Sequence, residues 1–449
     1  MLNPNTRDTL RRILMEWHES VLPRVTTREV DVHALVAPPI TAIIGPRRAG
    51  KTWLCFQAIR ALLDRKVPRE TILYLSLEDE RLHPLRGEEL TELLDVHREL
   101  FKVPESGERY FFVDEIQNAP NWSKWARRIT DQNPNLHLIL TGSSAKLLGT
   151  EIATELRGRA KTIALYPYSW LEYLVSREWD FQDYQGLDSL RFSPKKPDLR
   201  RLFHDFETLG GFPGVRKTEN PTETLQEYYR AMYTRDMIER FRIKNIPLFE
   251  DFLKLQISRF GSLSSASNLE TELRSLGHGG SKKTLLSYLG YAREILLLFE
   301  VHLFSPKVKN QLLYPRKIYG IDQGLLNAIR FSVSEDKGRI LENMVFLELK
   351  RRGHELFYFS GKGECDFVIR EKSRVTCLIQ SCYRMDSAKT REREVRGLLE
   401  AMDAFDCGNG LILTDDEYED IKTGNRNISV RPFWLWALER PLPKTGWNA

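Results

Sequence analysis

The sequence lacks long apolar runs and a cysteine framework. No run of about 18 uncharged apolar residues occurs, and the first residues, MLNPNTRDTLRRILMEW, carry charges where a signal peptide needs an apolar stretch. We therefore expect a protein that neither spans a membrane nor is secreted by that route. The five cysteines are an odd number, and their spacings match no zinc or CxxC motif. A reduced, cytoplasmic setting is the expectation.

Catalytic signatures based on histidine, cysteine or serine are also missing. The nine histidines show no HExxH or paired-ligand spacing, and neither a GxSxG elbow nor a Cys-His nucleophile pattern occurs. We therefore interpret the histidines as structural. With 449 residues, of which 41% are apolar, the chain has an ordinary globular composition and a length typical of about two to four domains.

The net charge of +5 is small for this length, but it is concentrated in one segment. Between residues 281 and 318 there are two acidic residues, Glu294 and Glu300, and seven basic ones, so this segment alone accounts for the excess of five. Such a run is either a solvated face or a surface that contacts nucleic acid phosphates. The basic residues are Lys282, Lys283, Arg293, Lys307, Lys309, Arg316 and Lys317.

Short apolar runs alternate with helical patterns between residues 40 and 165, which predicts βαβ units and a parallel sheet. The runs are nearly continuous in apolar residues, as strands buried on both faces require. The expected strands are 41–44, 71–77, 110–113, 136–140 and 162–165, with helices beginning near Lys51, Glu88, Trp122 and Ala145.

The second half of the chain has mixed patterns. Helical periodicity predicts helices at 202–209, 223–241 and 249–260, followed after Gly261 by three short helical patterns. Two apolar runs at 296–304 and 312–319, separated by SPKVKNQ, predict a basic hairpin. A last α/β segment follows from about Gly338, with strands expected at 356–359, 365–369, 375–379, 410–413 and 428–431.

The octapeptide GPRRAGKT at 45–52 fits the pattern G-x-x-x-x-G-K-[ST] and lies between an apolar strand and a helical pattern. In such a loop the glycines let backbone N–H groups point at phosphate oxygens, and the helix N-terminus adds its positive dipole end. Lys51 is expected to neutralise the β- and γ-phosphates, and Thr52 to offer its hydroxyl to Mg²⁺. The sequence therefore predicts an ATP and Mg²⁺ site formed by Gly45, Pro46, Arg47, Arg48, Ala49, Gly50, Lys51, Thr52 and Trp53.

An apolar strand that runs into Asp114 and Glu115 predicts the second half of this site. Asp114 is expected to hold the magnesium ion, and Glu115 to orient or deprotonate the attacking water. Thr141 and Ser143 follow another expected strand, which is predicted to neighbour the phosphate-binding one. Their hydroxyls either sense the γ-phosphate or cap the next helix.

With these residues assembled, the sequence resembles the prokaryotic AAA-type, STAND-related ATPases in which a winged helix and a restriction-endonuclease-like domain follow the AAA domain. The resemblance covers nearly the whole chain. The matching stretches are GPRRAGKT (45–52), EDERL (78–82), FFVDEIQ (111–117), LTGSSAKLL (140–148), LRGRAKTIALYPYSWLEYL (156–174), GGFP (210–213), RDMIERF (235–241), GRILENMVFLELKRRG (338–353) and ECDFVI (364–369).

The resemblance implies an α/β fold with four parts. These are an AAA-type P-loop NTPase domain with a parallel sheet at 1–168, a helical lid and linker at 169–249, a winged helix-turn-helix at 250–333 and a restriction-endonuclease-like α/β domain at 334–449. It also implies that Arg157 or Arg159 reaches the ATP of a neighbouring subunit, and hence a homo-oligomer such as a hexameric ring. The helix at 281–298 would face DNA and 304–314 would be the wing. The DNA-contact candidates are Lys282, Lys283, Arg293, Lys307, Lys309 and Arg316.

The resemblance to nucleases is incomplete. Glu342 and Asp366 stand where the family has its acidic residues, but Gln380 and Cys382 replace the Glu-x-Lys of the next strand. An amide is a poor ligand for magnesium and a thiol supplies no ammonium, so we expect a nuclease fold without cleavage.

The predicted function is therefore an ATP- and Mg²⁺-dependent ATPase that couples hydrolysis to remodelling or moving on duplex or branched DNA. Two alternatives stay open at this point. One is a nucleotide-controlled switch with a partner-binding platform, and the other is an ATP-gated nuclease.

Overall fold

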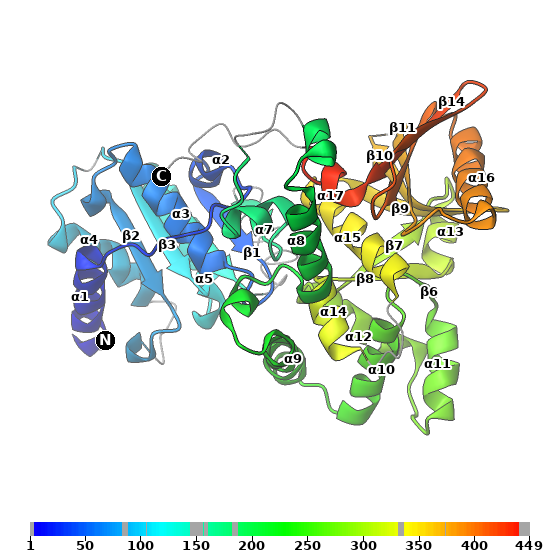
Figure 1. Ribbon diagram of the computed structural model, residues 1–449. Helices are drawn as coiled ribbons and strands as arrows, with labels where there is room; N and C mark the ends of the chain where they lie inside the picture. Colours follow the sequence, from blue (N-terminus) through cyan, green and yellow to red (C-terminus); the bar gives the residue numbers. More distant parts are fainter. Residues whose placement is uncertain are drawn as a thin grey trace. The chain divides into compact units, whose positions relative to one another are not determined.

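Two separate β-sheets organise the chain (Figure 1). The computed structural model describes residues 4–82, 89–104, 106–143, 156, 160–181, 187–330, 336–372 and 374–439. Its chain divides into two compact units, the first ending at Tyr166 and the second beginning at Pro167. Among the described residues, no helix has the length and apolar character needed to cross a bilayer.

The first unit contains a five-stranded parallel sheet in the order β2-β3-β4-β1-β5. All five strands predicted from the sequence are present, with ends shifted by at most two residues. β4 lies directly beside β1, as the sequence predicted. The strands are β1 (Ile40–Ile44), β2 (Ile72–Ser76), β3 (Arg109–Asp114), β4 (Leu136–Gly142) and β5 (Ala160–Ala164).

In the described part of the first unit, five α-helices accompany this sheet. α4 begins four residues after Glu88, where a helix was expected to start, because a 3-10 turn at Glu89–Thr91 precedes it. The helix expected near Ala145 lies outside the described residues. The helices are α1 (Pro4–Glu19), α2 (Val32–Val36), α3 (Lys51–Asp64), α4 (Glu92–Leu100) and α5 (Trp122–Gln132).

The core of the first unit fixes α3 against the sheet. Leu54, Ile59 and Leu62 of α3 are buried in one cluster with Ile43 of β1 and Phe112 of β3. Each fully buried aliphatic side chain contributes about 1.5–3 kcal/mol. Because α3 begins at Lys51, this packing also sets the position of the loop that precedes it.

The second unit begins with helices and ends in a mixed α/β segment. Its helices are α7 (Trp170–Ser176), α8 (Lys196–Leu209), α9 (Pro221–Ala231), α10 (Ile246–Ser258), α11 (Ala266–Ser275), α12 (Lys282–Glu294), α13 (Val308–Leu313), α14 (Gln323–Ile329), α15 (Lys337–Arg351), α16 (Ala388–Ala404) and α17 (Phe433–Trp436). Its strands are β6 (Leu263–Ser264), β7 (Leu298–Leu303), β8 (Arg316–Gly320), β9 (Glu355–Ser360), β10 (Glu364–Glu371), β11 (Arg374–Ser381), β12 (Asn409–Thr414), β13 (Glu419–Thr423) and β14 (Arg426–Pro432).

These strands form one nine-stranded sheet in the order β13-β14-β12-β11-β10-β9-β7-β8-β6. The antiparallel pair β7–β8 joins the C-terminal strands because β7 pairs in parallel with β9, with His302 opposite Phe357. The sheet therefore runs across the boundary predicted at 333, and the four-part division stays a prediction. The sequence did not predict β13, whose residues EDIKT offer no apolar run.

The predicted hairpin is present, because β7 and β8 pair antiparallel, but its connection, the expected wing at 304–314, contains the short helix α13. The Gln311 side-chain amide donates to the Ser305 carbonyl at 2.6 Å, and the His302 ring lies 3.1 Å from the Gln311 carbonyl. These bonds satisfy the carbonyls of Ser305 and Gln311 within the connection. As a result the second strand begins at Arg316 rather than at residue 312.

A buried aspartate explains the GGFP block. Asp322 accepts hydrogen bonds from the backbone N–H of Gly211 at 2.7 Å and of Leu325 at 2.8 Å, which joins the end of α8 to the start of α14. A Cβ atom on Gly210 would lie 2.0 Å from an Asp322 oxygen, and Gly210 has a φ of +74°. Only glycine fits there.

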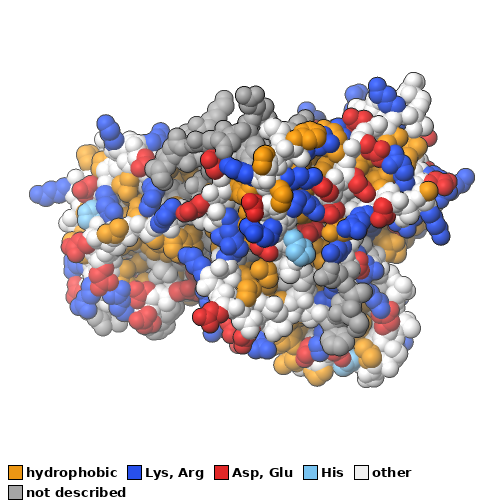
Figure 2. Space-filling model, viewed as in Figure 1, with side chains coloured by type: hydrophobic (Ala, Val, Ile, Leu, Met, Phe, Trp, Pro, Cys, Tyr) orange, Lys and Arg blue, Asp and Glu red, His pale blue; other side chains and the backbone are white. Residues whose placement is uncertain are grey.

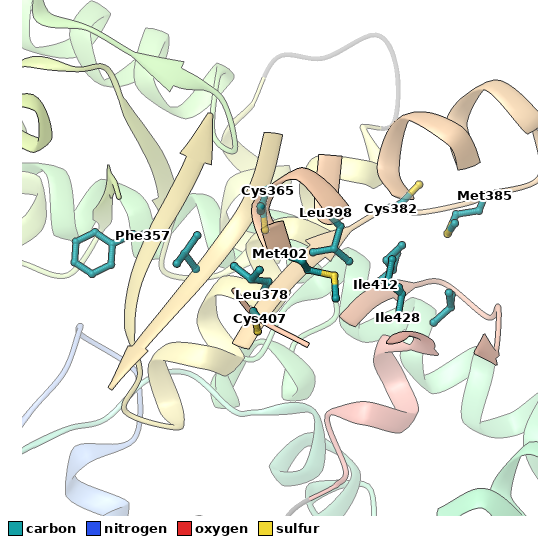
Figure 3. Close-up of a cluster of buried hydrophobic side chains, with 13 residues drawn as sticks. Phe357, Cys365, Leu378, Cys382, Met385, Leu398, Met402, Cys407, Ile412 and Ile428 are labelled. Carbon is teal, nitrogen blue, oxygen red and sulfur yellow. The ribbon is translucent and has the colours of Figure 1, made fainter. Parts of the chain in front are cut away.

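The C-terminal core contains three of the five cysteines (Figure 3). Cys365, Cys382 and Cys407 are buried in one cluster with aliphatic side chains of β10, β11 and α16. Burial raises the pKa of the Cys382 thiol to about 12. Cys382 is therefore a thiol at neutral pH, and all three side chains pack as small apolar residues.

His97 should make the stability of the first unit depend on pH. Its ring is buried against Phe101 and Phe111, and burial lowers its pKa from 6.5 to about 4. Between these values the unfolded chain binds a proton that the folded protein does not bind, so stability is lost as the pH falls below 6.5. Between pH 7 and pH 5 the free energy of unfolding should fall by about 2 kcal/mol less in His97→Leu than in the wild type. Urea unfolding at the two pH values measures this difference. His33 is exposed, so His33→Leu should keep the wild-type pH slope; equal slopes for both variants would contradict the prediction.

Candidate nucleotide-binding site

The loop at 45–50 connects β1 to α3 and is tightly curled. Arg48 and Gly50 have positive φ angles of 66° and 96°. A Cβ atom on Gly45 would lie 2.3 Å from the Leu165 carbonyl oxygen, so the loop passes too close to the end of β5 for any side chain at this position. Left-handed residues in such a loop turn successive N–H groups inward, which creates a concave site for anions.

Lys51 lies beneath this loop with only 5% of its surface exposed. Its ammonium donates to the carbonyl of Gly45 at 3.1 Å and to that of Pro46 at 3.2 Å. The same nitrogen lies 3.6 Å from Oε1 of Glu115. The buried Lys51 ammonium is thus held between the loop at 45–50 and the acidic residues at the end of β3.

Asp114 is the centre of a hydrogen-bond network that involves four elements. Its Oδ2 accepts from the hydroxyl of Thr52 at 2.7 Å and from that of Tyr74 at 2.9 Å, and its Oδ1 accepts from Thr141. Burial raises the pKa of Tyr74, so the phenol remains a proton donor to the carboxylate. Thr52 and Asp114, predicted as magnesium ligands, are therefore direct neighbours.

Glu115 follows in a left-handed conformation, with a φ of 53° and a ψ of 50°. For a residue other than glycine this costs roughly 1–2 kcal/mol, so the surroundings must stabilise it. Its backbone N–H donates to the Thr141 hydroxyl at 3.0 Å, and its carboxylate accepts from the Gln117 amide. Ser143 lies 3.5 Å from the same amide. Thr141 therefore contacts both acidic residues at once.

The donors present fit ATP and Mg²⁺. Mg²⁺ prefers oxygen ligands, and the hydroxyl of Thr52 and the carboxylate of Asp114 supply them within one hydrogen-bond length of each other. Lys51 and the start of α3 supply positive charge and N–H groups for phosphate oxygens. Arg47 is ion-paired with Glu78 at 3.7 Å, and Trp53 is 45% exposed on the first turn of α3. The finger candidates Arg157 and Arg159 lie outside the described residues.

Two contributors were missed by the sequence analysis. Tyr74 stands inside an apolar strand, where nothing marks it as polar in function. Arg28 is buried and donates to the carbonyl of Ala49 at 2.8 Å and to that of Tyr166 at 2.6 Å, so it supports the loop from below. It lies before the first strand in a stretch that matches no motif.

The DNA-contact candidates in the second unit fall into two groups. Lys282, Lys283, Lys307 and Lys309 are exposed. Arg293 and Arg316 both pair with Glu300, the former at 3.1 Å. Lys317 is only 5% exposed, so it adds nothing to a surface charge. On the face shown in Figure 2, basic and acidic side chains are interspersed.

Of the four residues predicted as a degenerate nuclease site, Glu342, Asp366 and Gln380 lie together and Cys382 does not. The side chain of Gln380 accepts from the backbone N–H of Asp366 at 3.1 Å, and Lys317 joins Asp366 to Glu342. Cys382 points elsewhere, into the apolar core, with its thiol 3.2 Å from the Arg384 carbonyl. The lysine of this cluster thus comes from β8, a strand that the sequence analysis did not connect with it.

The chain is similar to known protein families and proteins. A family model described as an AAA domain matches residues 37–174, and one described as a domain of unknown function matches 200–336. An uncharacterized protein of Methanocaldococcus jannaschii is 33% identical over 430 residues, which cover 92% of this chain and 91% of that protein. An uncharacterized protein of Haemophilus influenzae is 26% identical over 403 residues, covering 88% and 94%.

Solved structures give a weaker likeness. A Walker-type ATPase of Pyrococcus abyssi superposes with a TM-score of 0.44 and 19% identity, covering 69% of this chain and 99% of that one. The Orc1 protein of Aeropyrum pernix, solved in complex with DNA, gives a TM-score of 0.29 and 12% identity, covering 72% and 91%. The family therefore rests on the sequence matches: the chain belongs to the same family as the M. jannaschii protein, and its first unit is an AAA-type P-loop ATPase domain.

Proposed function

We propose that the first unit binds Mg·ATP and hydrolyses it. The observation that supports this most directly is the hydrogen-bond network around Asp114. The Thr52 hydroxyl lies 2.7 Å from Oδ2 of Asp114, and Oε1 of the next residue, Glu115, lies 3.6 Å from the Lys51 ammonium. Each of these residues has the chemistry that one part of phosphoryl transfer needs. Their positions are set by β1, β3, β4 and α3 rather than by long loops.

In this proposal Lys51 and the loop amides bind the β- and γ-phosphates, and Thr52 and Asp114 hold Mg²⁺. The metal would neutralise charge on the phosphates. Glu115 orients the attacking water and accepts its proton, with its carboxylate held by Gln117. An arginine of a neighbouring subunit, Arg157 or Arg159, would complete the site in a homo-oligomer.

We also propose that the second unit contacts DNA through Lys282, Lys283, Lys307 and Lys309. The support is that all four are exposed, and that Lys282 and Lys283 occupy the first turn of α12. Arg293 and Arg316 are weaker candidates, since each already pairs with Glu300. Hydrolysis would then drive remodelling of DNA or movement along it.

Removing the P-loop lysine or the acidic residue should have different effects. Lys51→Ala should weaken ATP binding by about 100-fold or more, because two charge-assisted contacts to phosphate are lost. Glu115→Gln should keep binding but lower kcat by about 10²- to 10⁴-fold, because no base remains. Fluorescent ATP titration and phosphate release measure the two effects. Lys124→Ala, at an exposed position of α5, is the control and should change neither. Normal binding by Lys51→Ala would refute the assignment.

Thr141 should act on turnover rather than on affinity. Thr141→Val keeps the shape but removes the hydroxyl that contacts Asp114 and the Glu115 backbone, and we expect kcat to fall about 10- to 100-fold. Thr141→Ser restores the hydroxyl and should recover most of the rate. A valine variant with wild-type kcat would mean that the acidic pair needs no positioning by β4.

Charge reversal should test the DNA proposal. Lys282→Glu with Lys283→Glu should weaken binding of labelled duplex DNA and reduce the slope of log K against log salt by about 2, because two phosphate contacts are lost. The matched control is Lys389→Glu with Lys422→Glu, which reverses the same charge at exposed positions in the same unit. Equal slopes for both double variants would contradict the proposed surface.

The nucleotide-controlled switch uses the same ATP site but needs no coupling of turnover to DNA. Phosphate release measured with and without duplex or branched DNA separates the two. Stimulation by DNA supports a DNA-remodelling ATPase, and an unchanged slow rate supports the switch.

A further inference from the structure

Three elements of the second unit meet at one buried ionic cluster. Lys317 of β8 donates to Oδ1 of Asp366 on β10 at 2.7 Å and to Oε1 of Glu342 on α15 at 2.9 Å. The side chains of Lys317, Asp366 and Glu342 are 7%, 8% and 12% exposed. An ammonium therefore lies between two carboxylates that are largely buried.

The cluster is satisfied by further hydrogen bonds. The Tyr319 hydroxyl donates to Oε1 of Glu342 at 2.7 Å, and the Ser381 backbone N–H donates to Oδ2 of Asp366 at 2.9 Å. Gln380 accepts from the Asp366 backbone and donates to Glu394 at 2.6 Å. Buried charges are tolerated only when they are paired and hydrogen-bonded in this way.

The donor set does not fit a divalent metal. Two carboxylates from a helix and a strand are the groups a nuclease uses to hold Mg²⁺, but here a fixed cation already lies between them. Gln380, which would have to supply the next ligand, has its amide engaged by Asp366 and Glu394. The Lys317 side chain is only 7% exposed, so little of it is accessible to a phosphate.

The charges also suit a lysine that stands in for a metal. Burial by itself lowers the pKa of Lys317, but Asp366 and Glu342 raise it above its ordinary value, so the ammonium is retained. One positive charge balances only one carboxylate, and burial together with Asp366 raises the pKa of Glu342 to about 7. A divalent ion would have balanced both.

We propose that the Lys317 ammonium permanently replaces a divalent cation between Glu342 and Asp366 and thereby fastens the β7–β8 hairpin to the C-terminal α/β segment. The site is then a structural clasp, which neither takes up metal nor cleaves DNA. This inference does not depend on the ATP or DNA proposals, because none of its residues belongs to either site.

Thermal unfolding of the full-length, nucleotide-free protein tests the clasp. Lys317→Met leaves two buried carboxylates without a cation and should lower the midpoint of the second unit by about 10 °C. Lys317→Met combined with Asp366→Asn and Glu342→Gln removes the charges together and should recover much of this loss. Lys422→Met, at an exposed position on β13, is the control. If Lys317→Met unfolds like the control, the clasp is refuted.

Manganese tests the replacement itself. Mn²⁺ should bind equally to chelator-treated wild-type protein and to the Asp366→Asn variant, because the cluster has no vacancy for metal. Lys317→Ala opens the site and should gain one Mn²⁺-binding event and a Mn²⁺-dependent rise in the unfolding midpoint, both absent from Lys317→Ala with Asp366→Asn. If Lys317→Ala does not fold, the wild-type and Asp366→Asn comparison still decides.

Two results would overturn the proposal. One is wild-type Mn²⁺ binding that Asp366→Asn removes. The other is cleavage of labelled DNA by wild-type protein in Mn²⁺ that Lys317→Met abolishes, since Lys317 would then be a nuclease lysine supplied from β8. Absence of cleavage together with no Asp366-dependent metal binding supports the clasp.

Discussion

The carboxylate of Asp114 is the point at which the parallel sheet of the first unit becomes a chemical site. Parallel strands end at the same edge, so β3 and β4 bring Asp114 and Thr141 together there, while Tyr74 reaches Asp114 from the middle of β2 and α3 adds Thr52. A buried carboxylate without these donors would be strongly destabilising. The same hydrogen bonds that make the aspartate tolerable therefore also hold together the residues that we propose as Mg²⁺ ligands, and they position the left-handed Glu115 beside Lys51.

Asp366 in the second unit shows the same constraint with the opposite result. It too lies on a strand that is buried along most of its length, near a second acidic residue, and it is paired by groups from neighbouring elements. In the first unit the corresponding residue, Asp114, accepts hydrogen bonds from hydroxyl groups, and a metal ion can bind beside these hydroxyls or displace them. In the second unit the partner is a lysine ammonium, which excludes a divalent ion by charge and by position. Whether a buried acidic pair can take up a metal thus depends on which side chains reach it from other elements.

The sequence was sufficient where a local pattern decides the structure. The continuous apolar runs of β1, β3 and β4 predicted buried parallel strands, and GPRRAGKT predicted the loop between β1 and α3 because its glycines are required by backbone geometry. It was insufficient where partners come from distant strands. Nothing near Lys317 in the chain indicates that Glu342 and Asp366 will neutralise it. The segment between β7 and β8 contains the short helix α13, where the Gln311 amide bonds to the Ser305 carbonyl.

The burial of Lys317 also changes what the concentrated charge means. The excess of five between residues 281 and 318 equals that of the whole chain, yet Lys317 faces two carboxylates from outside this segment, and Glu300 binds both Arg293 and Arg316. A long-range field depends on charges that remain uncompensated at the surface. Four exposed lysines on or beside α12 and α13 therefore remain to attract phosphates, and contact with DNA would rest on their placement rather than on the net charge of the segment.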